Sequence, residues 1–171
     1  MVMCSLSDAS KLARTGRWDE VMSLIQTRPE LAVREFDDGE TLLSAMSYFG
    51  EPRVVQLLIA AGADVNHQDK SGETPLLACL EGAYEGKDTK AAMSILLEAD
   101  ANPNQFAYMG QTALHWAVAY RLPDYVEILI SSGADPYLKS ADLEPENAFE
   151  IASRSMCSSL IAVLQRHEKR G

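Results

Sequence analysis

Apolar residues recur at spacings of three and four along most of the chain, which is the period of an amphipathic helix. Three such stripes are Leu43, Met46 and Ser47; Leu76, Cys79 and Leu80; and Leu114, Ala117 and Val118. A second stripe follows each of them: Val54, Val55, Leu57 and Leu58; Met93, Leu96 and Leu97; and Val126, Ile128 and Leu129. Each second stripe runs up to a Gly or Asp suited to a left-handed helix end. The pattern predicts a unit of helix, turn, helix and loop.

The residues that flank these stripes carry the signals of helix starts. Thr74 precedes the stripe that begins at Leu76, and its hydroxyl can accept a hydrogen bond from the free amides of the first turn. Pro75 then stands at the first helical position, where its missing amide hydrogen costs nothing. We therefore expect Thr74 to be the N-cap of a helix that starts at Pro75.

Two short phrases recur with these helices. Gly39–Leu43, Gly72–Leu76 and Gly110–His115 share one phrase, and 33 residues separate Gly39 from Gly72. Ala61–Asn66, Ala99–Asn104 and Ser132–Tyr137 share the other, near the end of each unit. This period, with Gly-x-Thr-Pro-Leu-His opening the unit and Gly-Ala-Asp-x-Asn closing it, resembles the ankyrin repeat.

The resemblance implies an all-α fold, an ankyrin-repeat solenoid of helix-turn-helix units joined by hairpin loops. Weaker copies at both ends extend the array, as expected of terminal repeats that face water. We expect one domain over residues 1–171, with repeats at about 2–35, 36–68, 69–106, 107–139 and 140–171. A single unit cannot bury its apolar face, so stability has to come from stacking on neighbours.

The net charge of −10 makes nucleic acid an improbable partner, because phosphate binding needs clustered cations. It favours a protein partner with a basic surface, although acidity that only keeps the chain in solution is the alternative. No apolar run approaches the ~18 residues of a membrane span, and the first residues do not resemble a secretory signal. We expect a cytoplasmic protein that is monomeric when free.

Residues that could carry chemistry are few and scattered. Cys4, Cys79 and Cys157 lack the spacing of a disulfide framework or a zinc site, which favours reduced thiols. His115 occupies the His of the repeat phrase, and His67 and His167 lie near no candidate nucleophile. Asp64, Asn66 and Asp69 cluster, but such residues are common in hairpins, where they bind backbone amides. We predict no catalytic, cofactor or metal site.

Ankyrin arrays usually bind proteins through hairpin tips and the exposed side of the first helices, which line a concave face. On this chain the resemblance assigns protein binding to Glu35, Asp37, Asp38, Glu40, Tyr48, Phe49, Lys70, Glu73, Glu81, Tyr84, Phe106, Tyr108, Met109, Gln111 and Tyr120. Tyr and Met are enriched in protein interfaces. We interpret the aromatic residues as exposed groups that add nothing to the core, although one or two could instead fold over a neighbouring helix.

The third unit departs from the period, because Asp100 arrives about five residues late. We expect the insertion near Gly82–Lys87 to fall between the two helices of its repeat. A loop tolerates such an insertion at small entropic cost, so it need not be functional. Its Tyr84 could also extend a binding edge. Trp116 is expected to pack against neighbouring repeats.

The predicted function is a non-catalytic module that binds and sequesters or inhibits a partner protein. We expect no second domain to recruit anything further, so binding itself would be the output. Two inhibitor classes resemble the chain: short acidic bacterial ankyrin proteins that neutralise a toxin, which we favour as an immunity-type role, and ankyrin inhibitors of cyclin-dependent kinases. A scaffold with several weak partners is the alternative, and an enzyme is a distant one.

Overall fold

The repeated helix signals produce repeated helix pairs. The computed structural model describes residues 6–36 and 38–168, which form ten α-helices and two 3-10 helices. Over those residues the fold is all-α as predicted: it holds no β-strand, only an isolated bridge between Glu35 and Thr41. Contacts divide the chain into an N-terminal unit, which ends at Ala101, and a C-terminal unit, which starts at Asn102. Cys4 and Asp37 lie outside the described residues.

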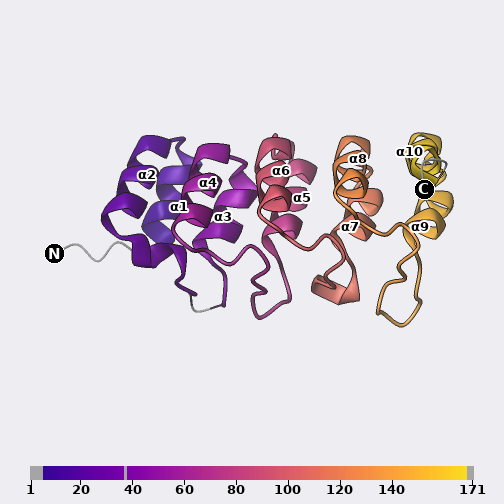
Figure 1. The fold of residues 1–171 in the computed structure, drawn as a ribbon, viewed down its shortest axis with the longest axis horizontal. Helices are drawn as coiled ribbons and strands as arrows, with labels where there is room; N and C mark the ends of the chain where they lie inside the picture. The colour runs from indigo at the N-terminus through magenta and orange to yellow at the C-terminus, as the bar shows by residue number, and fades with distance from the viewer. Residues whose placement is uncertain (1–5, 37, 169–171) are drawn as a thin grey trace. The chain divides into compact units, whose positions relative to one another are not determined.

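The N-terminal unit contains three helix pairs. They are α1 (Leu6–Arg14) with α2 (Trp18–Thr27), α3 (Leu42–Phe49) with α4 (Pro52–Ala60), and α5 (Pro75–Tyr84) with α6 (Lys90–Glu98); the 3-10 helix η1 spans Pro29–Ala32. Helix α3 packs against both α1 and α5, while α4 packs against α2 and α6. The first and second helices of the pairs therefore form two layers, and the hairpin loops extend away from them (Figure 1).

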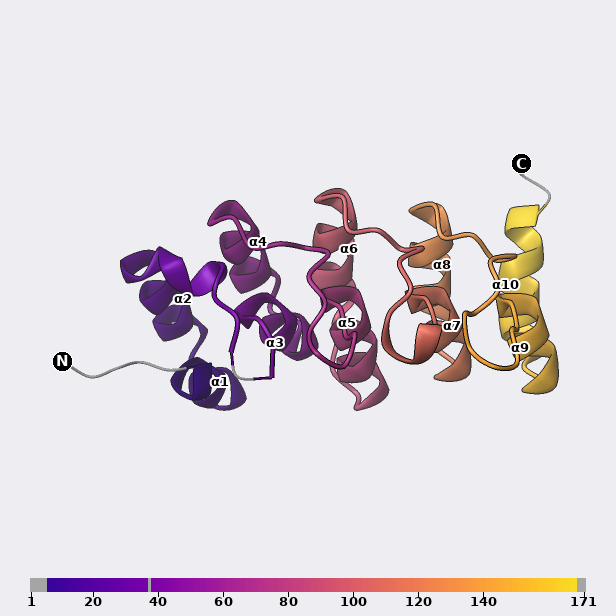
Figure 2. The ribbon, with the colours of Figure 1, turned by 90° about the horizontal axis from the view of Figure 1, so that it is seen from below.

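The C-terminal unit repeats this arrangement with two helix pairs. It contains the 3-10 helix η2 (Tyr108–Gly110), then α7 (Ala113–Ala119) with α8 (Pro123–Ser131), and α9 (Ala148–Arg154) with α10 (Ser158–Glu168). Helix α7 packs against α9, and α8 packs against α10 (Figure 2). Each pair thus buries its apolar stripe against the next pair, as the sequence pattern predicts.

The predicted stripes make up most of the core. All residues of the first-helix stripes are buried, including the polar Ser47. In the second-helix stripes Leu57, Leu97 and Ile128 keep partial exposure, although each adjoins a fully buried leucine: Leu58, Leu96 and Leu129 respectively. Successive helical residues point about 100° apart, so one of two neighbours can lie at the edge of the buried face, although Val54 and Val55 are both fully buried. The pattern was therefore right about the buried face and overestimated its width.

The helix ends agree with the predicted signals. Thr74 Oγ1 accepts from the Leu77 amide at 3.3 Å, and Pro75 is the first residue of α5. After the second helices, the predicted left-handed positions are occupied by Gly62 (φ +93°), Asp100 (φ +65°) and Gly133 (φ +91°). At these residues the second helix of each pair ends, and the left-handed backbone sets the direction of the following hairpin.

Side chains of the hairpins fix the turns and link one repeat to the next. Asp64 Oδ1 accepts from the Asn66 amide at 2.9 Å, and Asp69 Oδ1 accepts from the Glu73 amide at 2.8 Å. The Asn66 amide group donates to the Asp100 carbonyl at 3.1 Å. His67 Nε2 lies 2.8 Å from the Gly39 carbonyl oxygen. The Asp and Asn cluster therefore binds backbone, as hairpin residues do.

The insertion of the third repeat does not lie wholly between its helices, which corrects the prediction. Helix α5 continues to Tyr84, so the insertion lengthens this helix before residues 85–89 connect it to α6. The connection ends at the buried Thr89, whose hydroxyl donates to the Cys79 carbonyl at 2.6 Å. Helix extension satisfies backbone groups that a longer loop would leave to water.

Candidate functional site

Several of the predicted binding residues surround one cavity in the N-terminal unit. The cavity has a volume of about 300 Å³ and lies over α3 and α5; we call it the α3–α5 cavity. It is lined by Arg14, Glu40, Ser44, Ala45, Tyr48, Phe49, Glu73, Ala78 and Glu81. Glu40, Tyr48, Phe49, Glu73 and Glu81 were predicted from the sequence, whereas Arg14, Ser44, Ala45 and Ala78 were not.

The repeat period explains why these residues meet. Glu40 and Glu73 each stand directly before the N-cap threonine of their repeat, and Ala45 and Ala78 follow that threonine by four residues. Helices α3 and α5 pack side by side, so equivalent positions line the same surface (Figure 2). Ala45 and Ala78 both line the cavity, and their small side chains fill little of it. The spacing of Ala45 and Ala78 was visible in the sequence. That they line a cavity depends on how closely α3 and α5 pack, which the sequence does not show.

Burial dominates the electrostatics of the cavity. It raises the pKa of Glu73 to about 7, with further contributions from the carboxylates of Glu81, Asp69 and Glu40. Burial likewise raises the pKa of Glu40 and of Glu81. Within the described part of the chain, none of these three carboxylates has a hydrogen-bond or salt-bridge partner. The cavity therefore concentrates acidic groups that the fold itself does not neutralise.

The aromatic side of the cavity packs more than the sequence suggested. Tyr48 and Phe49 are half-buried and meet edge to face, with ring centroids 5.2 Å apart. Phe49 also meets the ring of Trp18 at 6.1 Å. Phe49 thus joins α3 to α2 through ring contacts, which is the alternative expected for one or two of these aromatics. Only part of each ring remains open to the cavity.

Residues of the insertion hold Tyr48 from the other side. The Tyr48 hydroxyl donates to Glu85, and Lys87 Nζ lies 3.9 Å from the centroid of the Tyr48 ring. Lys87 Nζ also lies 3.1 Å from Glu85 Oε2. Hydrogen bonds from Tyr48 and then Lys87 lower the pKa of Glu85. The insertion therefore fixes the Tyr48 ring, while Tyr84, predicted as a binding residue, is 65 % exposed.

The remaining predicted residues of this unit lie on the hairpins, outside the α3–α5 cavity. Glu35 is exposed, with Oε1 3.9 Å from His67 Nδ1. Asp38 accepts from the Glu40 amide at 3.0 Å, and its carbonyl accepts from the Lys70 amide at 3.2 Å. The predicted acidic group therefore divides: Glu40 faces the cavity, while Glu35 and Asp38 are exposed on the hairpin.

The C-terminal unit carries a separate group of rings, which we call the Tyr108 cluster: Tyr108, Trp116 and Tyr120. Tyr108 stacks on Trp116 with centroids 6.1 Å apart, and Trp116 meets Tyr120 at 5.3 Å. The ring contacts of Trp116 therefore lie within its own repeat. The helical spacing of four between Trp116 and Tyr120 was the signal that could have shown this.

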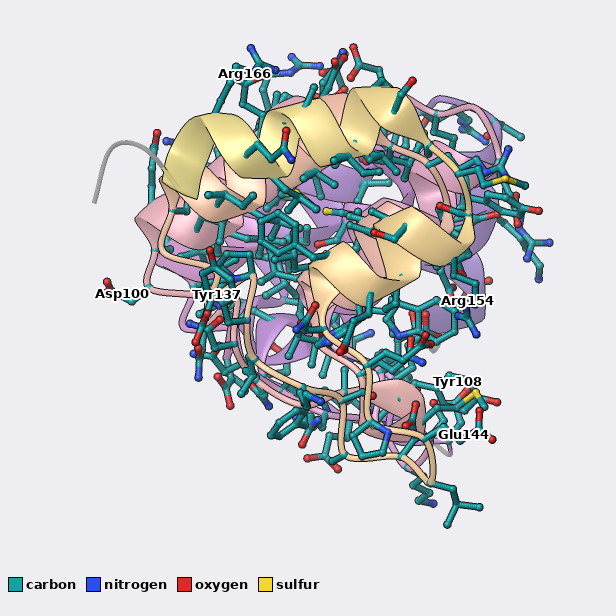
Figure 3. The ribbon with its side chains drawn as sticks, turned by 90° about the vertical axis from the view of Figure 1, so that its right-hand side faces the viewer. Asp100, Tyr108, Tyr137, Glu144, Arg154 and Arg166 are labelled. Carbon is teal, nitrogen blue, oxygen red and sulfur yellow. The ribbon has the colours of Figure 1, made fainter. Side chains whose placement is uncertain are left out.

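Apolar side chains beside the Tyr108 cluster remain accessible. Tyr108 is 44 % exposed, Phe106 41 % and the adjacent Met109 61 %, and Met109 has a positive φ of 57°. Gln111 Nε2 lies 3.4 Å from Asp142 Oδ2, which ties this hairpin to the next. Figure 3 shows Tyr108 on the same side of the unit as Glu144 and Arg154, with Tyr137 on the opposite side. The cluster offers partly exposed rings on one side of the unit.

His115 and Cys79 serve the framework. His115 Nδ1 accepts from the Thr112 amide at 3.1 Å, so Nε2 carries the proton and donates to the Glu146 carbonyl at 3.0 Å. Burial lowers the pKa of His115 and raises that of the Cys79 thiol. The described residues contain no cluster of three His, Cys, Asp or Glu side chains able to hold a metal ion. Within the same residues, no helix has both the length and the apolar character to cross a membrane.

Comparisons with known proteins agree with this architecture. The family model for ankyrin repeats matches residues 13–140 in 3 copies. The chain is 39 % identical over 87 residues, half of its length, to the nuclear factor NF-kappa-B p105 subunit of Gallus gallus. It is 36 % identical over 112 residues, 65 % of its length, to the B-cell lymphoma 3 protein homolog of Mus musculus.

A third relative is the NF-kappa-B inhibitor alpha of Homo sapiens, which is 30 % identical over 119 residues, 64 % of the chain. The matched segments span 8 %, 24 % and 36 % of these three relatives. The chain therefore shares a repeat region with them and not their full length. Since the family model covers most of the sequence and the helix pairs follow its period, the chain belongs to the ankyrin-repeat family.

Proposed function

We propose that this chain is a non-catalytic protein-binding module that sequesters or inhibits a partner protein. One observation carries the proposal: rings and carboxylates remain accessible on the first helices and hairpins, in the α3–α5 cavity and the Tyr108 cluster. Aromatic residues there offer large contact area at low entropic cost. The histidines described above serve packing and hairpin contacts, so they support binding over catalysis.

The relatives support an inhibitory role. The human relative is by name an inhibitor of NF-kappa-B, and we extend inhibition by binding to this chain. The net charge of −10 and the unpaired carboxylates of the cavity favour a partner with a basic surface. The most specific form of the proposal is an immunity-type protein that neutralises a toxin. Inhibition of a kinase is its nearest alternative.

The proposal includes a cytoplasmic protein that is monomeric before it binds. The free thiols of Cys79 and Cys157 support a reducing compartment, where cysteines remain unpaired. A scaffold that holds several weak partners is the competing form of protein binding. The two forms differ in how the binding free energy is distributed. In a dedicated inhibitor a few anchor residues contribute most of it, whereas in a scaffold each residue contributes little.

The test is quantitative capture of partners from a native lysate by wild type and by a Tyr108→Ala/Tyr120→Ala variant. A dedicated binder retains one dominant partner, and the variant weakens its affinity by more than about tenfold, because rings at an interface centre carry much of the binding energy. Thermal unfolding of each protein shows whether the variant is folded.

Tyr137→Ala is the matched control. Tyr137 is 51 % exposed and stacks on Phe149, so its removal costs a similar ring contact on the opposite side of the unit (Figure 3). The control should bind as wild type does. Equal losses in both variants would point to a general effect of lost rings and overturn the proposed surface. Many weak partners retained by every variant would favour the scaffold.

A further inference from the structure

The α3–α5 cavity combines features that suit one kind of ligand. Glu40, Glu73 and Glu81 line it, and their carboxylates have no hydrogen-bond or salt-bridge partner among the described residues. Partial burial of an unpaired carboxylate is unfavourable, and it is relieved when a cation arrives. Arg14 also borders the cavity, but it forms no salt bridge within the described part of the chain.

The carboxylates of the cavity are not grouped as metal ligands are. The carboxylates do not converge on a point, since the described residues hold no group of three acidic, His or Cys side chains close enough for a metal. The lining also includes the small apolar Ala45 and Ala78 and the aromatic Tyr48 and Phe49, which we call the aromatic wall. A ligand that fills about 300 Å³ must therefore combine an apolar stem with a cationic end.

The contacts of Tyr48 hold the aromatic wall in place. Lys87 Nζ lies 3.9 Å from the Tyr48 ring centroid, so the chain's own ammonium group already packs on this ring. Glu85 holds Lys87 and also accepts from the Tyr48 hydroxyl, so the insertion keeps Tyr48 fixed while a ligand enters. The cavity wall is thus built before binding, which reduces the entropic cost of association.

We propose that the α3–α5 cavity receives a lysine or arginine side chain from the partner protein. The methylene stem lies over Ala45 and Ala78 against the Phe49 ring, and the charged end pairs with the carboxylates of Glu73 and Glu81. The inference rests on the proposed protein-binding function and specifies the chemistry of the partner at this surface. Charge complementarity selects a basic chain over an acidic or purely apolar one.

The test uses a displayed library of random peptides, which requires no knowledge of the natural partner. Wild type should enrich peptides that contain Lys or Arg, and replacement of that residue by norleucine or citrulline should weaken binding by at least about tenfold. In the Glu73→Gln/Glu81→Gln variant, which keeps side-chain size, the same peptides should bind at least about tenfold more weakly. Amide chemical shifts of Ala45 and Ala78 should move on binding to wild type.

The control is Glu98→Gln/Glu144→Gln, which removes the same charge from exposed residues outside the cavity. Its affinity should change by less than about twofold, because exposed charges act weakly and over long range. Equal weakening in both variants would mean that net charge alone attracts basic peptides. That result would overturn the cavity proposal, as would peptide enrichment without Lys or Arg.

The pH dependence gives a second readout of the same peptides. The charged groups around Glu73 are Glu40 and Arg14 across the cavity, Glu81 on its own helix and Asp69 in the hairpin. The Glu73 pKa of about 7 means that this carboxylate gains its charge between pH 6 and 8. Affinity should therefore rise with pH across that range in wild type, and less in Glu73→Gln.

These outcomes separate this inference from the proposed function. The Glu73→Gln/Glu81→Gln variant could lose peptide binding and still capture the natural partner normally. The partner would then bind another surface. Such a result would overturn the cavity as the partner's binding site and leave protein binding intact. A chain that enriches basic peptides but retains no partner from its native lysate would instead contradict the proposed function.

Discussion

At the scale of single residues, Glu73 shows how position changes the chemistry of a common side chain. It stands directly before the N-cap Thr74, where it is half-buried beside Glu40, Glu81 and Asp69. Each neighbour adds negative charge to a site that burial already makes unfavourable for an anion. Because the pKa of Glu73 rises on folding, the free energy of unfolding depends on pH.

Glu73→Gln should stabilise the fold above neutral pH. The folded pKa of about 7 lies above the usual 4.5, so the folded chain holds a proton that the unfolded chain loses. The favourable contribution of protonated Glu73 is fully present below about pH 4.5 and is lost as pH rises through 7. At pH 8 we expect a gain of roughly 1–2 kcal/mol, because partial exposure screens the charge.

Urea unfolding at pH 4.5, 6 and 8 tests this expectation. The difference between variant and wild type should be small at the lowest pH and grow toward the highest. Glu98→Gln removes an exposed carboxylate from α6 and should show no such trend. A difference that is constant with pH would mean that the pKa of Glu73 is the same in the folded and unfolded states, which would contradict the expected shift.

At the scale of elements, the end of α5 packs so closely against α3 that no space remains for a side chain at Gly82. A Cβ added to Gly82 would lie 2.1 Å from the Tyr48 carbonyl oxygen, a backbone atom that cannot rotate away. The carbonyl of Asp88 would likewise meet a Cβ on Gly50 at 2.6 Å. The insertion therefore packs against the end of α3 through glycines on both sides.

Gly82→Ala should lower the free energy of unfolding by at least about 3 kcal/mol, because one methyl group forces α3 and α5 apart. Gly86→Ala is the matched control: its φ of +87° strains an alanine, but nothing lies within 4 Å of the added Cβ. It should cost only about 1 kcal/mol. Thermal or urea unfolding of the two variants measures the difference, and equal losses would argue against the close approach of the helices.

Sequence patterns predicted the helices well because their signals are local. The cap at Thr74, the stripe of Leu76, Cys79 and Leu80, and the left-handed Gly62 each depend on a few neighbouring residues. The α3–α5 cavity was predicted in part, since Glu40, Glu73 and Glu81 were assigned to binding but not to one cavity. The hydrogen bond between Tyr48 and Glu85 joins separate repeats, and no local pattern encodes such contacts.

At the scale of the whole molecule, stability arises between neighbouring helix pairs. Within each unit, first helices pack on first helices and second helices on second helices. A repeat array of this kind behaves as a line of coupled segments, in which a local defect acts mainly on adjacent segments. A mutation in one of the five proposed repeats should therefore destabilise that repeat and its neighbours more than distant repeats.

Leu160→Ala tests this locality. Leu160 is fully buried in α10, which packs against α8 and α9, so truncation should cost about 3 kcal/mol there. Amide hydrogen exchange should accelerate in α8, α9 and α10 while α3 and α5 keep their protection. A uniform acceleration through all helices would mean that the chain unfolds as one cooperative body.

The two tryptophans fall one in each unit. Trp18 meets Phe49 in the N-terminal unit, and Trp116 stacks with Tyr108 and Tyr120 in the C-terminal unit. Each indole is therefore a built-in fluorophore for a different half of the molecule. Replacing either by phenylalanine leaves a single tryptophan, and its emission, excited where tyrosine does not absorb, follows the unfolding of its own half without any added dye.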